Sequence, residues 1–459
     1  MAATQERPVS PAAARAVQRE KALQKLVTAF ISTGLFYMAL PGTFLGVWNL
    51  IAISSHRAAH SLSPAWIQAH GQAQVFGWIG TFIIGIGFYS LSKMGRLMPF
   101  AISRGWLSWM LWTLGIAIHW VTGVYGWHWR WMLPFSAILQ LAGFFVFFVT
   151  VRRHKAPQEL SGARRKMEMW MRLVVASTLI FLFALLLNLG GAVYVALYES
   201  APAFPAALDQ RLLLVSTWGF LVVTLWGFNA RWLPIFLGLA QPNARHLVAA
   251  LAILVLGIGA GLAGMAVLCS LLLIVASVLA ANALHVFRPG IQALKLEGIH
   301  PSFPYFVRGA YGWLLLAAAL ALCASLFDRN GGITGASRHA LTVGFLATMV
   351  FAIGQRVLPA FCGMHVLFSK KLMFFALLLL TIGCLLRVSC EIPAYEYNSP
   401  LAWRLLPVSA IAELTAVALF AINLIMTFMR PPAHLASVPT TITTSPPRKV
   451  SPIPPPAGN

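Results

Sequence analysis

Four of the twelve histidines lie in or beside long apolar stretches at the ends that the expected topology places near the outer face: His70, His119, His128 and His339. Imidazole in or beside hydrocarbon is energetically costly unless it is paired, so each is a candidate functional residue. Neutral imidazole is a common axial ligand of haem iron and a good ligand of copper. We predict that His70 and His339 hold a haem, and that His119 and His128 are alternative haem or copper ligands. The alternative for each histidine is a hydrogen bond to a backbone carbonyl or to interfacial water.

Gln74 and a row of small residues follow His70 on one helix face. Gln74 lies one turn after His70, where its amide could orient a ligand, bond a haem propionate or hydrogen-bond across helices. Gly77, Thr81 and Gly85 recur at four-residue spacing. Such a row either gives a flat cofactor a close approach or packs neighbouring helices tightly.

Two arginines occupy matching positions in a short internal repeat. The segment "LWGFNARWLPIFLG" (225–238) is similar to "VFAIGQRVLPAFCG" (350–363), with Arg231 and Arg356 in register, 356 − 231 = 125 residues apart. Such an arginine could contact a haem propionate; alternatively, it reaches the interface while the following proline stops the helix. The offset equals about four membrane spans, which indicates three parallel repeats of four helices.

The elements that must position these residues are transmembrane helices. Only 10% of the 459 residues are charged, against about 25% in soluble domains, and the mean hydropathy is +0.78. The apolar stretches are long enough to cross a bilayer. The sequence predicts an all-α polytopic membrane protein with helices at about 26–53, 70–92, 105–124, 131–151, 173–198, 212–230, 246–264, 266–287, 309–327, 339–358, 372–388 and 405–429.

The charge distribution predicts the orientation of the chain. The net charge is +22, but it is concentrated in alternate loops, which excludes nucleic acid as the partner and favours anionic lipid. With the N-terminus inside, the outer segments hold seven of the 33 Lys and Arg, so 33 − 7 = 26 are inside. We expect a basic cytoplasmic segment at 1–24, a membrane domain at 25–430 and a disordered Pro-rich cytoplasmic tail at 431–459.

Two stretches resemble known proteins. "HALTVGFLATMVFAIGQRVLPAF" (339–361) resembles the signature span of the NnrS family, bacterial inner-membrane proteins that bind haem and copper and are linked to nitric-oxide stress. "HGQAQVFGWIGTFIIGIGFYSL" (70–91) is similar to the second span of that family, and to that of haem-copper oxidase and nitric-oxide reductase catalytic subunits, whose outer histidine ligates a low-spin haem. The resemblance implies an oxidase-like arrangement of twelve helices, a b-type haem and copper as a second metal.

The sequence departs from these families in ways that bear on activity. Gln72 stands where NnrS proteins often carry a second histidine, and the sixth and seventh spans hold no histidine set for an active-site copper, apart from His246. Glu413 is the clearest acidic residue inside a span. These departures argue against a turnover oxidase, although the sequence leaves enzymatic activity open.

Three functions follow as hypotheses. The first is an NnrS-like haem protein that handles or senses nitric oxide or redox stress, with an open axial position for a diatomic ligand or with two histidines favouring electron transfer. The second is a degenerate oxidase or reductase that takes electrons from quinol or a cytochrome. The third is a transporter without a cofactor, in which Glu413 would be a coupling residue.

Overall fold

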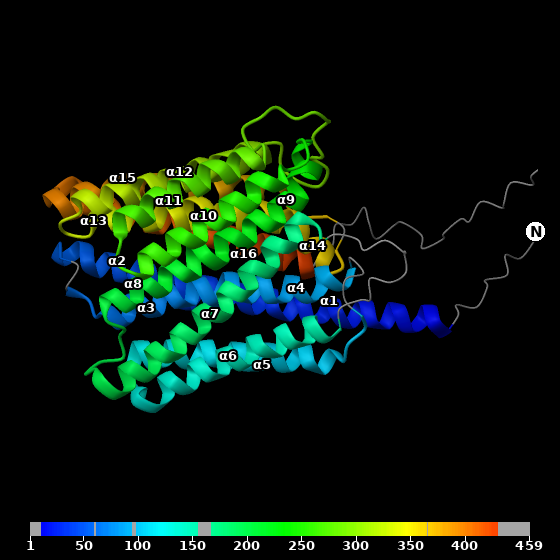
Figure 1. The fold of residues 1–459 in the computed structure, drawn as a ribbon, viewed down its shortest axis with the longest axis horizontal. Coiled ribbons are helices and arrows are strands. Elements are labelled where there is room, and N and C mark those ends of the chain that lie inside the picture. Colours follow the sequence, from blue (N-terminus) through cyan, green and yellow to red (C-terminus); the bar gives the residue numbers. More distant parts are fainter. Residues whose placement is uncertain (1–10, 59–60, 94–97, 155–166, 365, 430–459) are drawn as a thin grey trace, which may run out of the picture.

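The computed structural model describes residues 11–58, 61–93, 98–154, 167–364 and 366–429. Within them, twelve helical spans are long and apolar enough to cross a membrane, and they run along the longest axis of the molecule (Figure 1). The predicted all-α polytopic fold with twelve spans is confirmed. The expected tail at 431–459 lies outside the described residues. Residues 11–24 of the expected N-terminal segment are helical and continue into the first span.

The first five spans are built as follows, with η denoting a π-helical segment. Span 1 is α1 (Pro11–Tyr37), η1 (Met38–Phe44) and α2 (Leu45–His56). Span 2 is α3 (Pro64–Gln72), η3 (Ala73–Gly80) and α4 (Thr81–Lys93). Spans 3, 4 and 5 are single helices, α5 (Ile102–Tyr125), α6 (Trp129–Arg153) and α7 (Met169–Tyr198).

The remaining seven spans repeat this pattern. Span 6 is α8 (Ala206–Leu214), η4 (Val215–Val222) and α9 (Val223–Leu237). Spans 7, 8 and 9 are α10 (Ala244–Leu262), α11 (Ala266–Ala283) and α12 (Phe303–Phe327). Span 10 is α13 (Gly332–His339), η5 (Ala340–Ala347) and α14 (Thr348–Phe361). Spans 11 and 12 are α15 (Lys370–Tyr397) and α16 (Pro400–Met429).

Spans 2, 6 and 10 form the centre of the bundle. In these spans 78%, 83% and 78% of the most apolar window is buried, whereas the share in the other described spans is at most 56%. They begin at Pro64, Ala206 and Gly332, earlier than the predicted starts at 70, 212 and 339. Hydropathy underestimates their length because the first turns carry polar side chains that face an internal cavity rather than lipid.

A π-helical segment marks the same place in each central span. The segments η3, η4 and η5 each have eight residues, and the fifth residue of each is a glycine: Gly77, Gly219 and Gly344. π-helical segments inside α-helices are rare and occur frequently at functional sites. These three segments stand four spans apart, which supports the predicted organisation in three repeats of four helices, although span 1 carries a further π-helical segment, η1.

Each of the three glycines packs against a side chain of the span that precedes its own. A Cβ on Gly77 would lie 3.0 Å from the Cβ of Tyr37 in span 1, and one on Gly344 would lie 2.5 Å from the Cγ of Trp313 in span 9. On Gly219 it would lie 2.6 Å from the Cγ2 of Ile180 in span 5. The small residues of span 2 therefore serve helix packing, one of the two roles expected for them.

The two ends of the bundle differ in their polar residues. We call the end where spans 2, 6 and 10 begin the histidine end, because His70 and His339 lie there; it carries α3, α8 and α13 at the left of Figure 1. The opposite end, where α9 and α14 end a few residues after Arg231 and Arg356, is the arginine end.

Candidate functional site

A cavity of about 680 Å³ lies in the histidine-end half of the bundle, and residues from all twelve spans line it. Three of the predicted ligands, His70, His119 and His339, line this cavity, as does Gln74. They come from spans 2, 3 and 10. The structure therefore brings together residues that are up to 269 positions apart in the chain, since 339 − 70 = 269.

His70 is held by the π-helical segment of span 1. Its Nδ1 lies 2.8 Å from the carbonyl oxygen of Gly42, in the turn after Pro41. Since a carbonyl only accepts, we assign the proton to Nδ1, which leaves the lone pair of this imidazole on Nε2. The ring packs flat against Gly46, where a Cβ would lie 2.5 Å from the His70 Cε1. Span 1 thus fixes both the position and the tautomer of His70.

Gln74 supports the same turn of span 1. Its Nε2 donates to the Thr43 hydroxyl over 2.9 Å, and a Cβ on Gly42 would lie 2.7 Å from this nitrogen. Among the described residues, its Oε1 has no hydrogen-bond partner. Gln74 therefore holds η1 against η3 and keeps one acceptor at the cavity.

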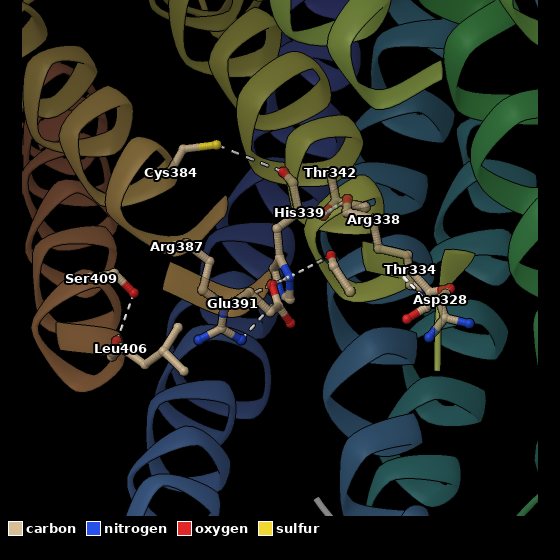
Figure 2. A network of polar contacts seen from close by, with 11 residues as sticks. Asp328, Thr334, Arg338, His339, Thr342, Cys384, Arg387, Glu391, Leu406 and Ser409 are labelled. Carbon is tan, nitrogen blue, oxygen red and sulfur yellow. Dashed lines mark hydrogen bonds and ion pairs between the residues drawn. The ribbon is translucent and has the colours of Figure 1, made fainter. Parts of the chain in front are cut away.

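His339 is held by two charged residues of span 11. Its Nδ1 lies 2.8 Å from Glu391 Oε2 and 2.9 Å from the carbonyl oxygen of Gly335 (Figure 2). Both partners are acceptors, so the proton is again assigned to Nδ1. Its Nε2 lies 3.2 Å from the Arg387 Nη2, which donates to it. Arg387 Nε also lies 3.7 Å from Glu391 Oε2. Figure 2 shows Arg387, Glu391 and His339 converging on one point.

Neither Glu391 nor Arg387 belongs to the predicted site. A signal for them exists in "LLRVSCEIPAY", where an arginine and a glutamate stand one helical turn apart inside an apolar stretch. Arg211 and Arg338, at the starts of spans 6 and 10, also line the cavity and were not predicted. Among the described residues, three arginines therefore line the cavity that the histidines share.

His119 belongs to a second polar group, between spans 2, 3 and 4. Its Nδ1 lies 3.4 Å from the Ser136 hydroxyl. One turn away, Gln72 donates to Gln140 over 3.2 Å, and Gln140 donates to the carbonyl oxygen of Gly115 over 3.3 Å. Gln72 immediately precedes η3 as His339 immediately precedes η5, so the two are equivalent positions in the repeat. At this position of the repeat, span 10 carries the imidazole of His339 and span 2 carries the amide of Gln72.

Three predicted residues lie outside the cavity lining. His128 is exposed beside Trp127 in the turn before α6. Arg231 lies 3.7 Å from Glu168 at the arginine end, and the Arg356 guanidinium stacks 4.0 Å from the ring of Phe236. Arg356 follows His339 by 17 residues, 356 − 339, a rise of about 26 Å along a helix. The structure does not bring these two arginines together with the histidines.

No group of three His, Cys, Asp or Glu residues that could hold a metal ion occurs in the described ranges. The pair of His339 and Glu391 is a smaller cluster of this kind, with 2.8 Å between the two side chains. Copper ligation by His119 or His128 stays a prediction.

The loop before α13 anchors the segment that carries His339. Asp328 accepts hydrogen bonds from the backbone N–H groups of Gly331 (3.0 Å) and Thr334 (2.8 Å), and from the Thr334 hydroxyl. Glu396, at the end of span 11, accepts from the N–H of Gly332 over 3.0 Å. Burial alone would raise the pKa of Asp328, but these hydrogen bonds outweigh burial and lower it.

Comparison with known proteins bears on the fold. No family model matches the chain, and no curated protein matches it. Among solved structures, the chain is similar to a haem-copper terminal oxidase dimer determined by cryo-electron microscopy. The identity is 13%, the match covers 89% of this chain and 84% of that one, and the TM-score is 0.55. The chain therefore has the predicted haem-copper-oxidase-like arrangement of twelve helices.

Proposed function

We propose that the chain is an NnrS-like membrane protein that binds a b-type haem in the histidine-end cavity, with His70 and His339 as axial ligands. The observation that carries the proposal is that both imidazoles line one cavity and each has Nδ1 beside an acceptor oxygen. In both rings the lone pair is then on Nε2, the nitrogen that a metal would take; in His339 this nitrogen accepts from Arg387, which a metal would replace. The haem would be held between two of the three central spans.

The lining of the cavity fits this cofactor. Its volume is within the range of about 300–1,000 Å³ found for ligand pockets. Arg211, Arg338 and Arg387 supply guanidinium groups, which bind carboxylates such as haem propionates through paired hydrogen bonds. Aromatic residues such as Trp78 and Trp218 add an apolar surface for a flat ring. The charge of the lining, the volume and the candidate ligands therefore support the same occupant.

The role that follows is the handling of nitric oxide or redox stress. A bound haem would supply an iron that exchanges one electron and binds diatomic ligands. Ligation by both imidazoles would favour electron transfer, and ligation by one would leave a position for a diatomic ligand. The hydrogen bonds of His70 and His339 hold the two rings from different spans, span 1 for His70 and span 11 for His339. Copper is proposed as a second metal, and quinol or a cytochrome as electron donor.

The proposed setting is a bacterial inner membrane, with both termini in the cytoplasm and anionic lipid at the inner face. The support is the distribution of Lys and Arg, of which only seven lie on the outer side in this orientation. Reporter fusions at the two termini test this orientation, and a reporter active only outside the cytoplasm at either terminus would overturn it.

Titration with nitric oxide tests the function. The purified, dithionite-reduced protein should show a haem spectrum whose Soret band shifts on addition of nitric oxide. A haem spectrum that does not change on addition of nitric oxide would favour the alternative of an oxidase-like or reductase-like enzyme that transfers electrons. A folded protein without haem, expressed with ample haem supply, would contradict the proposal and favour a transporter without a cofactor.

A further inference from the structure

We infer that Glu391 is a positioning residue that fixes the ring of His339 and makes this imidazole a stronger electron donor to a metal than His70. The inference rests on the proposed haem site. It goes beyond that site because it gives the two axial ligands unequal roles and assigns a function to a residue of span 11.

The first support is the geometry of the carboxylate. Glu391 Oε2 lies 2.8 Å from His339 Nδ1, and the glutamate side chain is 8% exposed. Gly335 makes this approach possible, because a Cβ at that position would lie 2.8 Å from the Glu391 Cδ. The carbonyl of Gly335 also accepts from His339 Nδ1 over 2.9 Å. Two acceptors therefore share the Nδ1 proton, which leaves Nε2 as the nitrogen that a metal would take.

The second support is the difference between the two histidines. His70 Nδ1 donates to the neutral carbonyl of Gly42 over 2.8 Å, whereas His339 Nδ1 donates to a carboxylate over the same distance. Hydrogen bonds to a charged acceptor are about twice as strong as neutral ones. A carboxylate on the outer nitrogen of a ligating histidine raises the basicity of the inner nitrogen. His339 should therefore stabilise the ferric state more than His70 does.

Arg387 completes the arrangement. Its Nη2 lies 3.2 Å from His339 Nε2, and its Nε lies 3.7 Å from Glu391 Oε2. When a metal takes the Nε2 lone pair, Arg387 loses that acceptor and keeps the carboxylate of Glu391. The side chains of Arg387 and Glu391 are 13% and 8% exposed, so the pair is shielded from solvent and acts at short range. His339 is therefore the more firmly held of the two imidazoles, with three hydrogen-bond partners among the described residues against one for His70.

Measurement of the haem midpoint potential tests the inference. Glu391→Gln keeps the size of the side chain and leaves a neutral acceptor, so the potential should rise. Glu413→Gln is the matched control, because Glu413 lines the same cavity. In the described part of the chain, its Oε1 has no hydrogen-bond partner. We expect a clearly larger rise for Glu391→Gln, with a shift of the near-infrared band of the ferric haem in this variant only.

Equal potentials in wild type and Glu391→Gln, or equal shifts in both variants, would overturn the inference and leave the haem site standing. Absence of haem from folded wild type would overturn the proposed function itself. If Glu391→Gln does not fold, Gly335→Ala displaces the carboxylate without removing it. That variant should also raise the potential, and an unchanged potential in it would overturn the inference.

Discussion

The imidazole of His70 lies against Gly46, where a Cβ would be 2.5 Å from the His70 Cε1 and 2.7 Å from its Nδ1. Both residues belong to the histidine end, but they lie on different spans. The position of the candidate ligand therefore depends on the absence of a side chain in span 1.

Gly46→Val should displace the His70 ring and lower the haem content of the purified protein severalfold. A branched side chain cannot share the space that the imidazole occupies, so the hydrogen bond to Gly42 is lost as well. Haem per protein can be measured by the pyridine haemochrome method. Gly190→Ala is the control, because no other described atom lies within 4 Å of its added Cβ. Normal haem content in Gly46→Val would contradict this role of Gly46.

Gly344→Ala should destabilise the bundle, because the added Cβ would lie 2.5 Å from the Cγ of Trp313. Overpacking of this kind costs about 1–3 kcal/mol, offset by about 1 kcal/mol of helix propensity. Thermal unfolding in detergent should show a lower Tm. Gly312→Ala, in span 9, provides the comparison, since the described residues leave open space around its Cβ and its Tm should not fall. A stable Gly344→Ala variant would show that the contact between spans 9 and 10 can relax.

The twelve spans could be predicted from the sequence because lipid-facing helices are apolar along their whole length. The starts of spans 2, 6 and 10 could not, because polar residues such as Gln68 and Arg211 face the cavity there. The gathering of His70, His119 and His339 could be predicted from their depth, since each lies near the end of its span that belongs to the histidine end of the bundle.

The charged partners of His339 were harder to predict, since Glu391 lies 391 − 339 = 52 residues further along the chain. Only the packing of α13 on α15 brings the two side chains together. The contact of Arg231 and Arg356 with a haem was predicted from a repeated motif, which does not indicate how far these arginines lie from the histidines. The helix length places that motif at the arginine end, away from the histidines.

Asp328→Ala should lower the Tm at neutral pH, because it removes the acceptor of the first-turn N–H groups of α13. The loss of such a cap costs about 1 kcal/mol. The pKa of Asp328 is below its ordinary value of 3.8 in the folded protein. Its contribution to stability is therefore present above that value and is lost as the pH falls through the lower, folded pKa. The difference in Tm between wild type and variant should shrink in acid, and a constant difference would contradict the assignment.

Arg338→Ala should weaken haem binding, whereas Arg356→Ala should leave it unchanged. Arg338 lines the cavity beside His339, and Arg356 lies about 26 Å further along span 10. Haem retention during gel filtration with a competing apoprotein measures the difference. Equal haem loss in both variants would instead support a propionate contact at the arginine end.

The most direct test of the account is the reduced-minus-oxidised visible spectrum of His70→Ala, His339→Ala and His128→Ala beside wild type. The wild type should show the sharp Soret and α-bands of a haem with two axial imidazoles. Either cavity variant should lose these bands, through loss of haem or conversion to a high-spin form. His128 is exposed outside the cavity lining, so His128→Ala should match wild type. Unchanged bands in His70→Ala and His339→Ala would contradict the assignment of both ligands.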